Sequence, residues 1–207
     1  VVAQSGHLVP ADKKLYALRD LTATVDSIPL ICASIMSKKL AMGADCILLD
    51  VKTGSGAFMK TEQEAVQLGE AMVRTAKLAG KRCRAVVTDM DMPLGSAVGN
   101  AIEVAEAISV LQGQRHTALG KLSLTLAAHM LTMCGRGTLE QCLASAEQAV
   151  DSGTALERFA WMLQCQGGDP AVAEHPERLP QPANSLTVTA DRAGYLTRIA
   201  SEEIGLA

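Results

Sequence analysis

Three polar residues in an otherwise apolar stretch have side chains suited to binding the edge of a flat ring. Arg19, Ser34 and Lys38 lie within LYALRDLTATVDSIPLICASIMSKKLA, residues 15–41. Arginine and lysine only donate hydrogen bonds, whereas a serine hydroxyl both donates and accepts. Together the three side chains complement a ligand edge that reads acceptor, donor, acceptor.

Uracil and thymine present that edge, because two carbonyl groups flank a ring N–H. Cytosine has an amino donor in place of one carbonyl, so a donor-only side chain there would leave a buried polar group unpaired, at a cost of about 1–3 kcal/mol. A site of this kind would reject cytosine. The spacing alone is also consistent with Arg19 and Lys38 as solvated charges and with Ser34 as a neutral helix residue.

A helix over residues 27–42 is predicted to position two of the three side chains. Apolar residues recur there at helical spacing, and Gly43 follows as a stop signal. Since Ser34 and Lys38 are four positions apart, they lie on one face of such a helix. Arg19 precedes the helix, in a segment that can fold back across that face.

A strand–helix–strand unit is predicted next along the chain. Residues 46–51 and 84–88 are short apolar runs typical of buried parallel strands, and residues 61–79 between them have an amphipathic helical pattern. This order indicates a βαβ unit. The remaining predictions are helices over 97–111, 118–134, 139–151 and 155–164, a loop over 167–185 and a hairpin formed by 186–190 and 195–199.

The composition favours a globular, cytoplasmic protein that binds neither nucleic acid nor a membrane. Of the 207 residues, 48% are hydrophobic and 20% are charged, and no apolar run reaches the roughly 18 residues of a membrane span. The net charge is -3, without a dense basic cluster for a phosphate backbone. The chain starts at Val1 rather than at a methionine, so we expect it to be part of a longer protein.

The cysteines and histidines show no zinc-ligand spacing and no CxxC motif, which favours a reducing compartment and disfavours zinc. We interpret all four histidines as ordinary core or surface residues. They are His7, His116, His129 and His175, and the cysteines are Cys32, Cys46, Cys83, Cys134, Cys142 and Cys165.

Three long motifs make the sequence resemble the pyrimidine-nucleoside and thymidine phosphorylases, most closely the bacterial pyrimidine-nucleoside phosphorylases. The motifs are ADKKLYALRDLTATVDSIPLICASIMSKKLA at 11–41, DVKTGSGAFMK at 50–60 and DMDMPLGSAVGNAIEV at 89–104. The resemblance implies a pentosyltransferase that catalyses reversible phosphorolysis. Inorganic phosphate, the co-substrate, displaces the base from uridine, thymidine or deoxyuridine and leaves a (2-deoxy)ribose 1-phosphate.

The resemblance also implies the roles of individual residues at the base. Arg19 and Lys38 would be catalytic and, with Ser34, would bind the pyrimidine. Negative charge grows on the departing base, and cations at its carbonyl groups stabilise the transition state more than the ground state. The apolar walls around the base would be Tyr16, Val25, Ile31 and Phe58.

One potassium site is implied by the third motif, with ligands from the backbone carbonyls of Leu94 and Ala97 and from Glu106, and the rest of the site would come from residues outside this sequence. Oxygen ligands suit a hard cation. The alternative is a plain strand-to-helix connection with Glu106 on a solvated face. The phosphate-binding loop of the family, which carries a Lys-His-Ser motif, has no counterpart in this sequence, and KTGSGAF lacks the Lys-Ser/Thr ending of a P-loop.

The fold implied by the resemblance is α/β. It has a small all-helical domain followed by an α/β domain with a central mixed or parallel sheet, as in class II nucleoside phosphorylases and anthranilate phosphoribosyltransferases. Residues 1–42 would be a returning segment of the helical domain with the pyrimidine-binding residues, 43–185 the α/β domain, and 186–207 the start of a truncated C-terminal region containing β-structure. The match lacks the N-terminal and C-terminal parts of the family, so we expect the isolated fragment to be inactive and the full-length protein to be a homodimer.

Three other functions remain open at this point. A strict thymidine phosphorylase would share the base-binding residues. An anthranilate phosphoribosyltransferase would share the domain layout, but its substrates would not require Arg19, Ser34 and Lys38 to bind a uracil-type ring. A truncated, non-catalytic paralogue would have an interaction or structural role.

Overall fold

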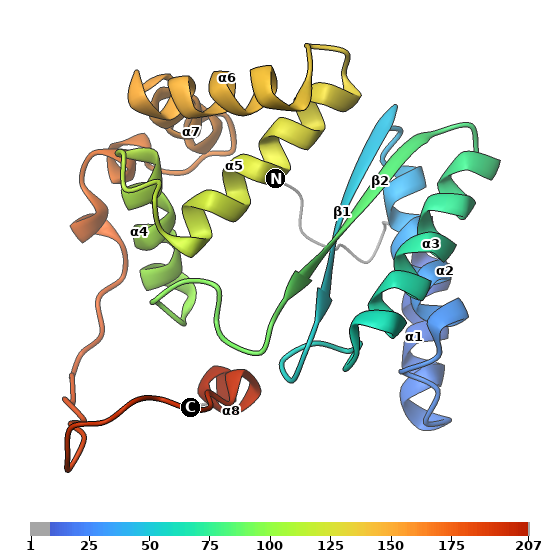
Figure 1. The fold of residues 1–207 in the computed structure, drawn as a ribbon, viewed down its shortest axis with the longest axis horizontal. Helices are drawn as coiled ribbons and strands as arrows, with labels where there is room; N and C mark the ends of the chain where they lie inside the picture. Colours follow the sequence, from blue (N-terminus) through green and yellow to red (C-terminus); the bar gives the residue numbers. More distant parts are fainter. Residues whose placement is uncertain (1–8, 207) are drawn as a thin grey trace. The chain divides into compact units, whose positions relative to one another are not determined.

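The computed structural model describes residues 9–206, which form two compact units (Figure 1). The first unit contains residues 9–91 together with residues 133–135. The second contains residues 92–132 and the chain from Arg136 onward. Within the described residues, no helix has the length and apolar character needed to cross a bilayer.

The first unit is built around a parallel pair of strands joined by a helix, which confirms the predicted βαβ unit. Strand β1 pairs in parallel with β2, from Cys46 opposite Arg82 to Thr53 opposite Asp89. Helices α2 and α3 lie on the same side of the strand pair, and α1 packs against α2 (Figure 1). The elements are α1 (Pro10–Leu21), α2 (Ile28–Ala41), β1 (Cys46–Thr53), α3 (Glu62–Leu78) and β2 (Arg82–Asp89).

The core of this unit lies between β1 and the two helices that cover it. Alternate residues of β1 point toward the helices and are buried, namely Ile47, Leu49 and Val51. Met36 of α2 and Met72 of α3 meet them there. Because complete burial of an apolar side chain of this size contributes about 1.5–3 kcal/mol, this layer holds α2 in place and, with it, the side chains that α2 carries.

Both strands are longer than predicted, and polar residues on the face away from α2 and α3 accompany the added pairing. Lys52 forms an ion pair with Asp50 at 2.7 Å and donates a hydrogen bond to Thr88 at 3.0 Å. Thr88 in turn donates to Asp50 at 2.5 Å. Ladder hydrogen bonds come from the backbone, so they persist beyond the apolar run from which the strands were predicted.

Helix α1 was not predicted as a helix. It begins with Pro10, whose fixed φ suits the first turn of a helix. Leu15, Leu18 and Leu21 are exposed on it, whereas Asp12 and Arg19 are its buried residues. Leu15, Leu18 and Leu21 recur at helical spacing, so the periodicity was present in the sequence, but the burial is the reverse of that of an amphipathic surface helix.

The second unit is helical, and its four long helices match the predicted segments within about three residues. Arg115 donates to Asp151 at 2.8 Å and to Glu147 at 3.2 Å, which ties the turn after α4 to the end of α6. The elements are α4 (Asn100–Leu111), α5 (Ala118–Met133), α6 (Leu139–Asp151), α7 (Thr154–Cys165), the 3-10 helices η1 (Pro170–Ala173) and η2 (Pro176–Arg178), and α8 (Ser201–Leu206).

The predicted C-terminal hairpin is absent from the described residues, and this correction has a clear physical reason. Residues 186–190 and 195–199 have no strand, and a short helix, α8, follows them. Leu186, Val188 and Tyr195 are exposed, Tyr195 at 99%, so nothing packs on the apolar side chains. A two-stranded hairpin without a packing partner is marginal in water. The predicted domain boundaries after residues 42 and 185 stay a prediction.

Candidate functional site

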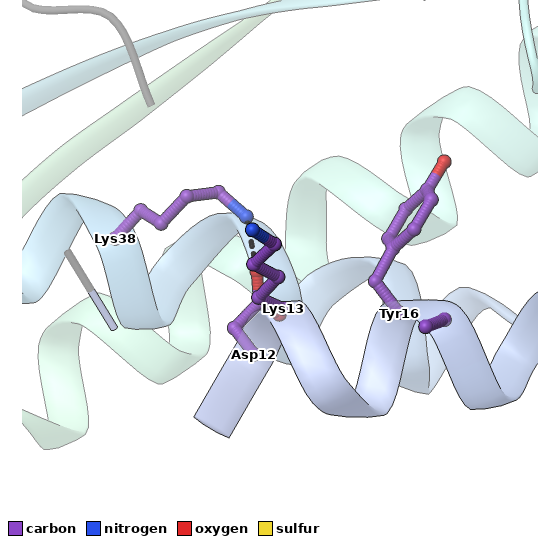
Figure 2. Close-up of a pocket in the computed structure, with 5 residues that line it drawn as sticks. Asp12, Lys13, Tyr16 and Lys38 are labelled. Carbon is purple, nitrogen blue, oxygen red and sulfur yellow. Dashed lines mark hydrogen bonds and ion pairs between the residues drawn. The ribbon is translucent and has the colours of Figure 1, made fainter. Parts of the chain in front are cut away.

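Helices α1 and α2 bring three polar side chains into direct contact. The Lys38 ammonium group lies 2.6 Å from Oδ2 of Asp12 and 2.9 Å from Oγ of Ser34. Figure 2 shows Lys38 reaching from α2 to Asp12 on α1, with Tyr16 one turn further along α1. The contact between Ser34 and Lys38 follows from their spacing of four residues on one helix.

Asp12 and Lys38 form a partly buried ion pair. The Asp12 side chain is 8% exposed and the Lys38 side chain 24%. Burial raises the pKa of Asp12, but hydrogen bonds from Lys38 and Ser34 and the positive charges of Lys38 and Arg19 outweigh it and leave the pKa below its ordinary value. Asp12 is therefore ionised at neutral pH, and the cluster combines a carboxylate with cations from both helices.

A cavity of about 410 Å³ opens beside this ion pair. Its walls combine charged groups with an aromatic ring. The lining residues are Asp12, Lys13, Tyr16, Ala17 and Lys38 (Figure 2).

Arg19 lies on the same helix but is held differently. Its guanidinium donates to the backbone carbonyl of Thr24 at 3.4 Å and to that of Val25, and it stacks over the Tyr16 ring at 5.0 Å from the centroid. The residue is 6% exposed. Arg19 therefore braces the loop between α1 and α2, and its charge acts on Asp12. The structure joins Ser34 and Lys38 directly and places Arg19 over the Tyr16 ring, and neither Ser34 nor Arg19 is among the residues that line the cavity.

The four residues predicted as apolar walls have different surroundings. Tyr16 lines the cavity. Val25 is half-buried, and its carbonyl accepts the bond from Arg19. Ile31 belongs to the core beneath α2. Phe58 is 62% exposed in the loop after β1. Only Tyr16 among these four lines the cavity of the described residues, and the other three assignments stay predictions.

Asp12 and Lys13 were missed as site residues, although both stand in the first motif. A signal for Asp12 was present in the sequence. Asp12, Tyr16 and Arg19 are separated by four and three residues, which places them on one face if their segment is helical. Without a prediction of α1, this shared face could not be seen.

The three residues predicted to hold potassium lie in the second unit: Leu94 and Ala97 in the loop before α4, and Glu106 on α4 itself. Glu106 accepts hydrogen bonds from the backbone N–H of Ser96 at 2.7 Å and of Ala97 at 3.0 Å. The loop wraps so closely around this carboxylate that a Cβ on Gly95 would lie 2.2 Å from its Oε2. A carboxylate has about four acceptor positions, so two amide donors leave oxygen lone pairs for a hard cation.

The side chains that most often bind metals or act as bases do not gather elsewhere in the described part of the chain. Residues 9–206 contain no group of three or more His, Cys, Asp or Glu side chains arranged to hold a metal ion. His116 is exposed, His129 half-buried, and exposed His175 contacts Glu177 at 3.1 Å. His7 lies outside the described residues.

Comparisons with known proteins agree with the motifs. The family model described as "Glycosyl transferase family, a/b domain" matches residues 1–156. Pyrimidine-nucleoside phosphorylases of Staphylococcus aureus, from strains bovine RF122 / ET3-1 and USA300, are each 53% identical to the chain over 208 residues. The alignments cover 100% of this chain and 48% of each relative, so the chain spans about half the length of the curated relatives it matches.

Proposed function

This chain belongs to the glycosyl transferase family through its a/b domain, and on that premise we propose that the complete protein is a pyrimidine-nucleoside phosphorylase. The observation that carries the proposal is the cluster of Lys38, Ser34 and Asp12 beside a cavity that Tyr16 also lines. The substrates would be uridine, thymidine and deoxyuridine, with inorganic phosphate as the second substrate. The homodimer and the cytoplasmic location implied by the resemblance belong to the same proposal.

Lys38 is suited to stabilise the departing base. An ammonium group has three N–H donors, and bonds to Asp12 and Ser34 occupy two of them. The third is available to a ring carbonyl at the cavity. As phosphate displaces the base, negative charge accumulates on that oxygen, and a fixed cation there lowers the barrier.

Arg19, which lies over the Tyr16 ring, would be the second cation of the site. Its bonds to the carbonyls of Thr24 and Val25 use Nε and Nη2, and a guanidinium has five N–H donors. Arg19 is not among the residues that line the cavity, so its guanidinium would have to turn toward the cavity for the donors of Nη1 to reach a second ring carbonyl. This arrangement would supply the two cations that the acceptor, donor, acceptor edge requires.

The phosphate-binding loop expected for this activity is not among the 207 residues. A displacement reaction is fast only when both substrates are held close together in the correct orientation. Binding of the base alone therefore gives little catalysis. We therefore expect the 207 residues by themselves to be inactive, whereas the complete protein carries out the phosphorolysis.

A potassium ion is the cofactor that we propose for the loop before α4. The carbonyl groups of Leu94 and Ala97 and the carboxylate of Glu106 would hold it, and the close wrapping of this loop around Glu106 supports the assignment. Bound potassium would supply charge that orders the loop. Replacing potassium by sodium in the assay of the complete protein should lower its activity, and equal activity in the two salts would remove the proposal.

Substitution of the two cations in the complete protein tests the function. Each charge-assisted hydrogen bond contributes about 1.5–3 kcal/mol, so Lys38→Ala and Arg19→Ala should each lower kcat for uridine at least about tenfold. The measurement is release of free base from uridine and thymidine at saturating phosphate.

Lys39→Ala is the matched control, because Lys39 is the exposed neighbour of Lys38 on α2. It should retain the wild-type kcat. Near-normal kinetics in both Arg19→Ala and Lys38→Ala would contradict the assigned roles.

The wild-type protein separates the alternative functions. Activity on thymidine without activity on uridine would narrow the function to a strict thymidine phosphorylase. A wild-type protein that is inactive on both nucleosides would favour a non-catalytic paralogue.

A further inference from the structure

The Asp12 carboxylate has no role in the base recognition derived above, yet it is the closest partner of Lys38 at 2.6 Å. We propose that Asp12 is a positioning residue, which holds the ammonium group of Lys38 so that one of its N–H donors stays at the cavity. The inference rests on the proposed function, because it concerns the same site.

Two partners from two helices fix the free end of Lys38. A lysine side chain has four flexible methylene groups and loses about 2 kcal/mol of rotamer entropy when it is held in one conformation. Ser34 lies one turn earlier on the same helix, so its bond alone would leave the ammonium group free to rotate about the Ser34 hydroxyl. Asp12 adds an anchor on α1, and the two bonds together leave a single direction for the third donor.

A carboxylate suits this position better than a neutral acceptor because cations surround it. Lys38, Arg19 and Lys13 bring three positive charges to the site, where Lys13 and Lys38 line the cavity and the Arg19 charge acts on Asp12. Like charges in a partly buried site repel one another. One ionised carboxylate offsets part of this repulsion and still leaves the site net positive, as a departing anionic base requires.

The role predicts a loss of turnover rather than of ground-state binding. If Lys38 swings away from the cavity, the carbonyl oxygen loses the cation that matters most as charge develops. In the complete protein, Asp12→Ala should lower kcat for uridine at least about tenfold with a smaller change in KM. Asp12→Asn keeps one acceptor without the charge, so its effect should be smaller. Asp20→Asn makes the same change at an exposed position of α1 and should have no effect.

A double-mutant cycle separates positioning from a structural role. If Asp12 acts through Lys38, Asp12→Ala should lower kcat little further in a protein that already carries Lys38→Ala. If Asp12 had only a structural role, the decreases in kcat caused by Asp12→Ala and by Lys38→Ala would be independent and would multiply in the double variant. Multiplying effects, or an Asp12→Ala variant with wild-type kcat, would overturn the inference while the proposed function stands.

A crystallographic readout keeps the inference testable without any activity. In the structure of the folded Asp12→Ala or Asp12→Asn variant of the complete protein, the Lys38 ammonium group should leave its place beside Ser34 or become disordered. An unchanged Lys38 in both variants would overturn the inference. If the wild-type protein releases no base from any pyrimidine nucleoside, the proposed function fails, and the position of Lys38 still decides whether Asp12 holds it.

Discussion

At the scale of single residues, the candidate site is a set of charges whose partners come from different elements. Lys38 is bound by Asp12 and Ser34, whereas Arg19 is bound by two backbone carbonyls and by the face of the Tyr16 ring. Buried charges persist only when they are paired and hydrogen-bonded. The pairing therefore explains how these charged groups are held in place in the fold.

The lowered pKa of Asp12 makes a prediction about stability and pH. The pKa is lower in the folded chain than the ordinary value of 3.8, so the folded state binds protons less readily than the unfolded state does. The contribution of Asp12 to stability is complete above pH 3.8 and is lost as the pH falls through the lowered folded pKa. Asp12→Asn should therefore lower the urea midpoint at pH 7, and this difference should shrink at acidic pH.

Urea unfolding followed by circular dichroism at several pH values would measure this difference. Asp20→Asn provides the control, since Asp20 is exposed and should give a midpoint close to that of the wild type at each pH. A constant difference between wild type and Asp12→Asn from pH 7 to strongly acidic pH would contradict the assigned ion pair.

The sequence predicted part of this residue-scale picture. The contact between Ser34 and Lys38 was predictable because four residues on one helix fix a shared face. For Arg19, the sequence predicted only that its segment could fold back across that face. In the structure, its guanidinium donates hydrogen bonds to the carbonyls of Thr24 and Val25. Asp12 could not be placed, because an ion pair between two helices depends on how the helices pack.

At the scale of elements, helix ends were predictable where a local hydrogen bond defines them. The hydroxyl of Thr61 accepts from the backbone N–H of Glu64 at 3.3 Å, and the Glu64 carboxylate accepts from the backbone N–H of Thr61 at 3.0 Å. The same backbone bond and the Thr61 hydroxyl lower the pKa of Glu64. Tertiary packing decides the other cases: α1 buries Asp12 and Arg19 while its leucines stay exposed, and the hairpin at 186–199 does not form without a covering layer.

Removal of the α3 cap tests the element that supports α2. Thr61→Ala deletes one acceptor of the capping box and should lower the free energy of unfolding by about 1 kcal/mol. Urea unfolding followed by circular dichroism would measure the change. Gln63→Ala alters an exposed residue two positions later and should stay within about 0.5 kcal/mol of wild type. Equal midpoints for the two variants would show that the cap does not stabilise α3.

At the scale of the whole molecule, the chain contains the cluster that we propose for base binding but not the loop expected for phosphate. It spans about half the length of its curated relatives, and the family model covers residues 1–156. The α/β character and the parallel pairing were predictable, since the order strand, helix, strand leaves few alternatives. The grouping of α1 and α2 with the βαβ unit was not, because it depends on which apolar faces meet.

The central claim is that a hydroxyl and two cations on α1 and α2 select a pyrimidine with two ring carbonyls. Its most direct test is the ratio of kcat/KM for uridine to that for cytidine in the complete protein. An unpaired donor costs about 1–3 kcal/mol, so uridine should be preferred at least about fivefold, and Lys38→Ala should reduce the preference. Equal use of the two nucleosides by the wild-type protein, or a preference for cytidine, would contradict the account.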